Sequence, residues 1–182
     1  MAFEQDIERV FAEAGAIKER VAELGDKITR DYAGREITMI GLLTGAVTFM
    51  ADLARQIRLP VYYEFMSVSS YGQSSVSSGQ ITVKKDVGRD VAGRHIILVD
   101  DIADTGLTLN YTATKLAGRK PASLKICAFL DKPARRETAL SVDYTGFTAP
   151  DEFLVGYGLD YAQKYRNLPY VGILKKSVYN KP

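Results

Sequence analysis

The sequence contains one cysteine and one histidine in 182 residues, and these two shortages exclude whole classes of protein. A single cysteine cannot form an internal disulfide, and one cysteine with one histidine cannot build a zinc site from Cys and His ligands. Cys127 stands inside the apolar stretch "LKICAFL", where no neighbour is set to activate its thiol, so we expect a core residue and not a nucleophile. His95 has no obvious catalytic partner either, and we expect it to be structural.

An excess of charge of one sign is also missing, because 24 basic and 22 acidic side chains leave a formal net charge of +2. The basic pairs are scattered along the chain at Lys84-Lys85, Arg135-Arg136 and Lys175-Lys176. No block resembles a nucleic-acid-binding tail, although separate pairs can still form a basic patch after folding. The composition therefore favours a protein without a nucleic-acid partner.

Long hydrophobic runs are absent as well. The longest largely apolar stretch, residues 39–51, is too short and too rich in Gly and Thr to span a bilayer. The N-terminal "MAFEQDIERVF" carries acids and lacks the basic start and apolar centre of a secretion signal. We therefore expect a cytoplasmic protein with no membrane partner.

The 46% apolar residues are ordinary for a globular protein, and 182 residues suit one domain. Apolar spacing from Phe3 to Tyr32 predicts one amphipathic helix, or two helices broken near Gly15 or Gly25. Further helices are expected at 46–57 and 107–117. Strands are expected at 37–43, 61–68, 80–86, 95–101 and 123–131, with shorter ones at 142–147, 153–158 and 170–174.

Strands that alternate with helices predict an α/β fold, a doubly wound, mostly parallel sheet flanked by helices. The tail after residue 140 does not follow this alternation, and we expect it to form a small subdomain against the first helix. The Ser/Gly-rich segment 69–79 cannot bury enough apolar surface to order itself, which predicts a mobile loop.

The segment "ILVDDIADTGLTL", residues 97–109, carries the strongest chemical signal. A buried strand ends on Asp100 and Asp101, and a turn of small residues then opens a helix. Amides at a helix start favour an anion, and Gly106 lets a phosphate approach the backbone. Carboxylates accept hydrogen bonds and so suit sugar hydroxyls or a metal. A plain helix cap at Asp104 is the simpler interpretation, but it explains one acid of three.

This segment resembles the phosphoribosyl pyrophosphate (PRPP) motif of the type I phosphoribosyltransferases. With "GLLTGAVTFMADL", "FMSVSSYG", "KICAFLDKP" and "DEFLVGYGLDYAQKYRNLPYVGIL", the chain is similar to the hypoxanthine(-guanine) phosphoribosyltransferases from about residue 5 to 179. The resemblance implies a single domain over 1–182, with a core at about 35–140 and a hood from about 1–15 and 145–182. It implies a homodimer or homotetramer that uses Mg²⁺.

The implied reaction joins hypoxanthine, and also guanine, to PRPP and gives IMP or GMP and pyrophosphate. The resemblance implies that Asp104 is the general base, or accepts a hydrogen bond from the purine N7 proton. It also implies that Ser70 and Tyr71 close over the site during catalysis. Its PRPP-binding positions are Asp100, Asp101, Ala103, Asp104, Thr105, Gly106, Leu107 and Thr108.

For the purine, the resemblance implies that Lys132 donates to the 6-oxo group, that Phe153 stacks on the ring, and that Leu154 and Leu159 frame the pocket. An ammonium only donates, so it would reject the 6-amino group of adenine. From the residues alone, a lone lysine after a strand is usually a solvated surface residue, and without the resemblance this is the preferred interpretation of Lys132. Phe153 can also be read as a core aromatic of a short strand, and this interpretation is compatible with stacking on the purine.

For the metal, the resemblance implies Asp160 together with Asp100 and Asp101. Its pyrophosphate-binding positions are Leu43, Thr44, Gly45, Arg136 and Arg166, with a cis peptide bond between Leu43 and Thr44. The chain departs from the family pattern at three positions. Thr44 stands where many members have Lys, Ala46 where many have Gly or Ser, and Asp100 where many have Glu. A helix-surface role is an equal alternative for Arg136.

Two other functions stay open at this point. A regulator that binds nucleotide and RNA on the same fold would need a basic face. A transferase for adenine, xanthine or a pyrimidine could use the same PRPP turn. Lys132 and the tail motif favour 6-oxopurines over adenine and pyrimidines, but the sequence does not rank hypoxanthine, guanine and xanthine.

Overall fold

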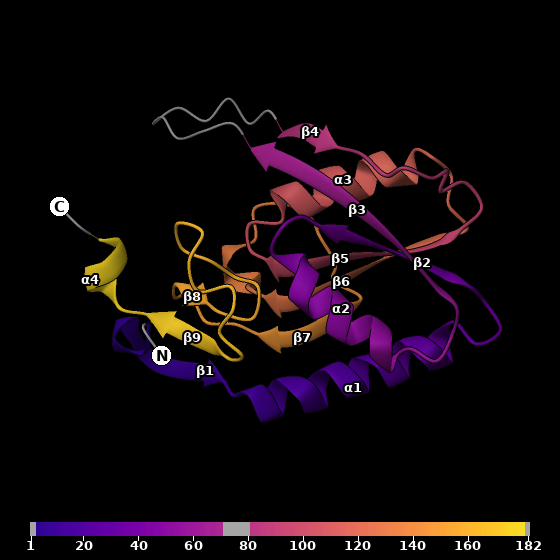
Figure 1. The fold of residues 1–182 in the computed structure, drawn as a ribbon. Coiled ribbons are helices and arrows are strands. Elements are labelled where there is room, and N and C mark those ends of the chain that lie inside the picture. Colours follow the sequence, from indigo (N-terminus) through magenta and orange to yellow (C-terminus); the bar gives the residue numbers. More distant parts are fainter. Residues whose placement is uncertain (1–2, 71–80, 181–182) are drawn as a thin grey trace.

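The computed structural model describes residues 3–70 and 81–180, and it contains one larger and one smaller sheet (Figure 1). The larger sheet has six strands in the order β4-β3-β2-β5-β6-β7. All neighbouring pairs are parallel except β3–β4. Its strands are β2 (Ile37–Leu42), β3 (Val61–Ser70), β4 (Ile81–Lys85), β5 (His95–Ala103), β6 (Ser123–Asp131) and β7 (Tyr144–Thr148).

Helices cover both faces of this sheet, as a doubly wound fold requires. The helices α1 (Ala14–Asp31) and α2 (Ala46–Gln56) lie on one face, and α3 (Leu107–Ala117) lies on the other (Figure 1). Side chains of β5 alternate between the two hydrophobic clusters. Ile97 and Val99 pack with α1 and α2, whereas Ile96 and Leu98 pack with α3. Burial on both faces explains the continuous apolar run of this strand. The predicted fold class is confirmed.

The N-terminal segment differs from the prediction. Residues 7–12 form strand β1 (Ile7–Ala12) and not the first turns of a helix. This strand pairs antiparallel with β9 (Val171–Leu174), which pairs with β8 (Leu154–Val155). Pairing with a partner more than 150 residues away outweighs the local helical spacing, which no single segment can reveal. A short 3-10 helix, Glu4–Asp6, precedes β1.

Helix α1 continues through Gly25, one of the two positions where the sequence left a break open. A Cβ built on Gly25 would lie 2.4 Å from the Cβ of Gln56 in α2. The glycine therefore allows α1 and α2 to pack closely and does not end the helix.

The tail after residue 140 divides between the two sheets. Strand β7 extends the larger sheet beside β6, and β8 and β9 join β1. The tail was expected to lie against the first helix, and β7 does pack on α1, where Arg20 donates to the carbonyls of Thr145 and Gly146. Strand β9 pairs with β1, the segment that precedes α1. The division into core and hood stays a prediction. A second 3-10 helix, Pro133–Arg135, follows β6, and α4 (Lys176–Tyr179) follows β9. Within residues 3–70 and 81–180, no helix is long and apolar enough to cross a membrane.

Candidate active site

Three loops meet at the carboxyl ends of neighbouring parallel strands. Residues 43–45 follow β2, residues 104–106 follow β5, and residues 132–136 follow β6. Strand β5 pairs with β2 on one side and with β6 on the other, so the three loops are neighbours. Open α/β sheets bind ligands at this edge.

The acidic pair lies within β5 and not at its end, because the strand continues to Ala103. Asp100 Oδ1 accepts from the amide of Asp101 at 3.0 Å, and Asp101 Oδ1 accepts from the amide of Ile102 at 3.1 Å. Burial, reinforced by the charge of Asp101, raises the pKa of Asp100 well above the usual carboxyl range. Burial also raises the pKa of Asp101. Ionisation of this pair is therefore energetically unfavourable, and a bound cation or hydroxyl donors would stabilise the ionised form.

The turn after β5 presents unused amides to a cavity. Gly106 has φ +84 and is the N-cap residue of α3, so Asp104 is not the cap of this helix. Among the described residues, the backbone N–H groups of Asp104, Thr105, Gly106 and Thr108 donate no hydrogen bond to the protein. The Leu107 amide differs, because it donates to Thr105 Oγ1 at 3.4 Å.

A cavity of about 230 Å³ lies against this turn and is lined by Asp100, Asp101, Ile102, Asp104, Thr105, Gly106, Thr108 and Leu109. Ala103 is fully buried, and the Leu107 side chain is exposed, so neither lines this cavity with its side chain. Free amides at a helix start bind anions. The turn can therefore hold a phosphate, with two carboxylates beside it.

A second cavity, of about 510 Å³, gathers side chains from distant segments. It shares Asp101, Ile102 and Asp104 with the first cavity. Its other lining residues are Lys132, Arg135, Asp151, Glu152, Phe153, Leu154, Leu159, Asp160 and Tyr179. The structure thus brings together in one pocket all four positions expected at the purine. Asp104 and two expected metal carboxylates, Asp101 and Asp160, lie there as well.

Lys132 is buried, with 6% of its surface exposed, so the interpretation as a solvated surface lysine is wrong. Its Nζ donates to the carbonyl of Glu152 at 2.7 Å. Burial lowers the pKa of Lys132, and the nearby Asp104 carboxylate opposes this effect. A lysine in this setting has two further donors for a ligand acceptor in the pocket.

Phe153 is stacked on Tyr179, with ring centroids 4.9 Å apart and an interplanar angle of 27°. The ring of Tyr161 meets it edge-on at 5.4 Å. Phe153 also belongs to a hydrophobic cluster, so it combines a packing role with a place in the pocket wall. Tyr179 comes from α4 and was not expected at the pocket.

Asp104 forms an ion pair with Arg135, whose Nε lies 2.9 Å from Asp104 Oδ1. The same guanidinium donates from Nη1 to Asp151 at 3.1 Å. Arg135 therefore bridges two carboxylates on the pocket wall, one of them the Asp104 carboxylate near Lys132. Neither Arg135 nor Asp151 was predicted at the site.

The loop 43–45 has the expected cis peptide bond between Leu43 and Thr44. The Leu43 amide donates to Met66 at 2.8 Å, which ties the loop to β3. Gly45 lies directly against Asp101, because a Cβ built on Gly45 would lie 1.8 Å from Asp101 Oδ2. The loop and the acidic pair are therefore in contact.

The two expected pyrophosphate arginines have different surroundings. Arg166 Nη2 lies 2.7 Å from Asp160 Oδ1, and its Nη1 donates to the Gly158 carbonyl at 2.7 Å. Arg136 pairs with Asp131 and packs under Gly106, where a built Cβ would lie 2.9 Å from Arg136 Cδ. Arg136 is thus largely buried and not a helix-surface residue. Within the described part of the chain, its side chain contacts Asp131 and the phosphate turn.

Ser70 ends β3, and its backbone pairs with Ile81 of β4. Tyr71 and most of the expected mobile loop, residues 71–80, lie outside the described residues. The expected closure by Ser70 and Tyr71 stays a prediction.

Comparison with known proteins decides the family. The family model described as "Phosphoribosyl transferase domain" matches residues 11–162. A hypoxanthine-guanine phosphoribosyltransferase of Bacillus subtilis is 48% identical over 174 residues, which cover 96% of this chain and 97% of that protein. One from Streptococcus pneumoniae is 46% identical over 177 residues, covering 97% and 98%. The chain belongs to the phosphoribosyltransferase family.

Two further matches add to this assignment. The crystal structure of a hypoxanthine phosphoribosyltransferase from Staphylococcus aureus superposes on this phosphoribosyltransferase with a TM-score of 0.96 at 39% identity, covering 100% of this chain and 98% of that one. A bifunctional protein TilS/HprT of Listeria innocua is 46% identical over 175 residues. This chain spans 27% of the length of that relative. The resemblance seen in the sequence is confirmed.

The carboxylates of this phosphoribosyltransferase fit a magnesium ion that is bound partly by substrate. In the described ranges, no group of three or more His, Cys, Asp or Glu side chains forms a complete metal cage. Asp160 is engaged by Arg166 and by the Gln163 amide at 2.8 Å. Asp100 and Asp101 form no ion pair among the described residues. Magnesium commonly takes one or two carboxylates, waters and phosphate oxygens, which matches this donor set.

The site residues that the sequence analysis missed are Arg135, Asp151, Glu152 and Tyr179. Arg135 follows a motif lysine by three positions, but its partner Asp151 lies 16 residues farther on, so pairing could not be read from spacing. Glu152 contributes a backbone carbonyl, which no side-chain pattern encodes. Among these, Tyr179 alone was recognisable from the sequence, as an aromatic residue in a largely polar C-terminal segment.

Proposed function

We propose that this chain joins a 6-oxopurine to PRPP and releases pyrophosphate, converting hypoxanthine to IMP and guanine to GMP. The relatives named hypoxanthine-guanine phosphoribosyltransferase support the substrate class. The main support for the proposal is that two adjoining cavities share lining residues. One presents free helix-start amides, and the other presents Lys132 and an aromatic wall, with Asp101 and Asp104 shared between them.

The base pocket supplies a donor and an acceptor for one edge of the purine. In the proposed mechanism Lys132 donates to the 6-oxo group, and the 6-amino group of adenine, also a donor, would leave the ammonium unpaired. Asp104 accepts the proton of N7, or a hydrogen bond from it, as the ribosyl bond forms. Arg135 holds the carboxylate in place at 2.9 Å. Phe153, backed by Tyr179, stacks on the ring, which Leu154 and Leu159 enclose.

The second cavity suits the ribose phosphate of PRPP. Amides of Thr105, Gly106 and Thr108 donate to the 5′-phosphate, and Asp100 and Asp101 accept from the ribose hydroxyls. The bond from C1 of the ribose to pyrophosphate breaks through a cation-like state, while the new bond to the base forms. Holding both reactants in one geometry supplies much of the acceleration.

The loop Leu43–Gly45 would bind the leaving pyrophosphate through its backbone, and Arg166 would supply positive charge from the chain. The metal would be held by Asp160, Asp100 and Asp101 together with phosphate oxygens, and it would supply positive charge for the departing group. The Thr44 side chain brings no charge, so this loop contributes through its backbone. Ser70 and Tyr71 would exclude water by closing over the site. The cytoplasmic location and the homodimeric or homotetrameric assembly stay predictions.

The test is a steady-state assay with hypoxanthine, guanine, xanthine and adenine, each with PRPP, with and without Mg²⁺. We expect turnover of hypoxanthine and guanine, no turnover of adenine, and loss of activity when EDTA removes the metal. Formation of AMP at rates equal to IMP, or no nucleotide from any base, would contradict the proposal. Preference for xanthine would keep the reaction and change the substrate.

A further inference from the structure

Gly45 of the loop 43–45 is enclosed from two sides. On one side lies the Asp101 carboxylate. On the other lies the turn Gly156–Gly158, where a Cβ built on Gly158 would lie 2.3 Å from the Gly45 carbonyl oxygen. Gly158 has φ +103, a conformation that glycine adopts readily, so this turn can press its backbone directly onto the loop. The position of the turn therefore limits where the loop can lie.

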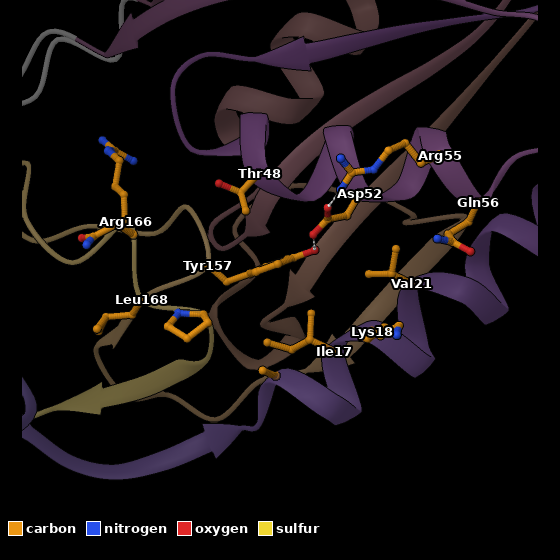
Figure 2. A pocket seen from close by; sticks show the side chains of 13 residues that line it. Ile17, Lys18, Val21, Thr48, Asp52, Arg55, Gln56, Tyr157, Arg166 and Leu168 are labelled. Carbon is orange, nitrogen blue, oxygen red and sulfur yellow. Dashed lines mark hydrogen bonds and ion pairs between the residues drawn. The ribbon is translucent and has the colours of Figure 1, made fainter. Parts of the chain in front are cut away.

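Tyr157, the middle residue of this turn, extends along α2 to Asp52 (Figure 2). Its hydroxyl donates to Asp52 Oδ2 at 2.7 Å, and 5% of its surface is exposed. Asp52 in turn pairs with Arg55. Burial and the Asp52 hydrogen bond raise the pKa of Tyr157, so the phenol stays protonated and keeps donating at physiological pH.

Other hydrogen bonds join the turn to a different segment. The Tyr157 amide donates to Leu168 at 2.9 Å, and the Gly158 amide donates to the Arg166 carbonyl at 3.0 Å. Arg166 Nη1 returns a hydrogen bond to Gly158. Within the described part of the chain, the Tyr157–Asp52 bond is the hydrogen bond that joins this turn to α2, the helix that begins directly after Gly45.

Tyr157 and Asp52 do not line the pocket assigned to the base. They line a separate cavity of about 500 Å³ between α1, α2 and residues 166–169 (Figure 2). A role for them in the reaction must therefore be indirect, through the loop that the turn covers.

We propose that the Asp52–Tyr157 hydrogen bond positions the pyrophosphate loop by holding the Gly156–Gly158 turn against Gly45. Both are positioning residues, and the inference rests on the proposed function because it assigns 43–45 to pyrophosphate. The bond fixes the turn relative to α2, the turn fixes the Gly45 carbonyl, and Gly45 fixes the loop beside Asp101. Loss of the bond should weaken PRPP binding and leave the base pocket unchanged.

The test compares Tyr157→Phe with the wild-type protein. This substitution removes the hydroxyl and keeps the ring that packs on Phe129 at 4.7 Å. We expect the KM for PRPP to rise about tenfold, the scale of one buried hydrogen bond to a charged group. The KM for hypoxanthine and kcat at saturating PRPP should stay within about twofold.

Two variants of Asp52 test the pair itself. Asp52→Asn keeps an oxygen that accepts from the phenol, so its KM for PRPP should stay close to the wild-type value. Asp52→Ala should reproduce Tyr157→Phe, and the double variant should be no worse than either single one, because both remove the same interaction.

The chain supplies a matched control in Tyr144, a buried tyrosine that donates to Asp31 at 2.8 Å far from the loop. Tyr144→Phe removes an equivalent hydrogen bond and should lower the thermal midpoint without changing the KM for PRPP. An equal rise of this KM in Tyr144→Phe, an equal rise of the hypoxanthine KM in Tyr157→Phe, or no change in Tyr157→Phe would each overturn the inference.

Calorimetric titration of PRPP with Mg²⁺, in the absence of base, separates this inference from the proposed function. If the wild-type protein binds PRPP but turns over no purine, the proposed function fails. The ratio of Kd values between wild type and Tyr157→Phe then still tests the positioning role, with about tenfold weaker binding expected.

Discussion

Replacement of Gly45 by alanine tests the contact at the centre of the site. Gly45 has φ −59 and ψ −42, which alanine adopts without strain, so the substitution changes space and not backbone preference. The new Cβ would lie 1.8 Å from Oδ2 and 2.7 Å from Oδ1 of Asp101. Either the loop or this carboxylate must therefore move by about 1 Å, a displacement that can cost about 100-fold in rate.

The substitution should impair the use of PRPP, because the loop and Asp101 are both assigned to that substrate. We expect kcat/KM for PRPP to fall about 100-fold, equivalent to about 2.7 kcal/mol of transition-state stabilisation. The measurement is an initial-rate assay of IMP formation at varied PRPP with saturating hypoxanthine and Mg²⁺. Thermal unfolding of the same preparation separates this effect from loss of the fold.

Gly15→Ala is the matched control, since a Cβ built on Gly15 in α1 has no neighbour within 4 Å. It should leave the kinetics unchanged and stabilise the protein by about 0.5–1 kcal/mol through the lower flexibility of alanine. Wild-type kcat/KM for PRPP in Gly45→Ala, with an unchanged melting temperature, would refute the assignment of this contact.

Three further predictions concern the base pocket. Asp104→Asn should keep PRPP binding and lose about 100-fold or more in kcat, and wild-type turnover would remove Asp104 from the chemistry. Lys132→Ala should reduce the preference for hypoxanthine over adenine about tenfold, measured as a ratio of kcat/KM values, and an unchanged ratio would refute that role. Because burial lowers the pKa of Lys132, kcat/KM for the base should decline at alkaline pH below the usual lysine range as the ammonium loses its proton. Lys132→Ala should lack this decline, and an alkaline limb that persists in the variant would assign it to another group.

The strands and helices of the larger sheet were predictable because local and tertiary preferences agree there. The segment 123–131 is apolar on both faces and forms β6 with the expected ends, and α3 ends at Gly118 as its pattern indicates. Residues 7–12 were not predictable, because their apolar spacing suits a helix and only the distant β9 makes them a strand. Local pattern fails where a long-range partner decides.

The candidate site divides in the same way. Site residues on one continuous segment, such as Asp100 to Thr108, can be recognised from the sequence because three acids and a small-residue turn occur together in a short stretch. Lys132 did not, because a lone lysine after a strand usually lies in solvent, and its burial depends on the segment around Glu152. The role of Tyr157 could not be predicted from the sequence, because it depends on a hydrogen bond to Asp52, 105 positions away.

The distribution of charge separates the acidic pair from the other carboxylates of the site, which are paired with arginines. Asp104 is paired with Arg135, Asp131 with Arg136, and Asp160 with Arg166. Asp100 and Asp101 have no such partner among the described residues, and burial and mutual repulsion raise the pKa of Asp100. A magnesium ion that arrives with PRPP would supply the missing positive charge at this position. Metal and PRPP should therefore bind cooperatively, each more tightly in the presence of the other.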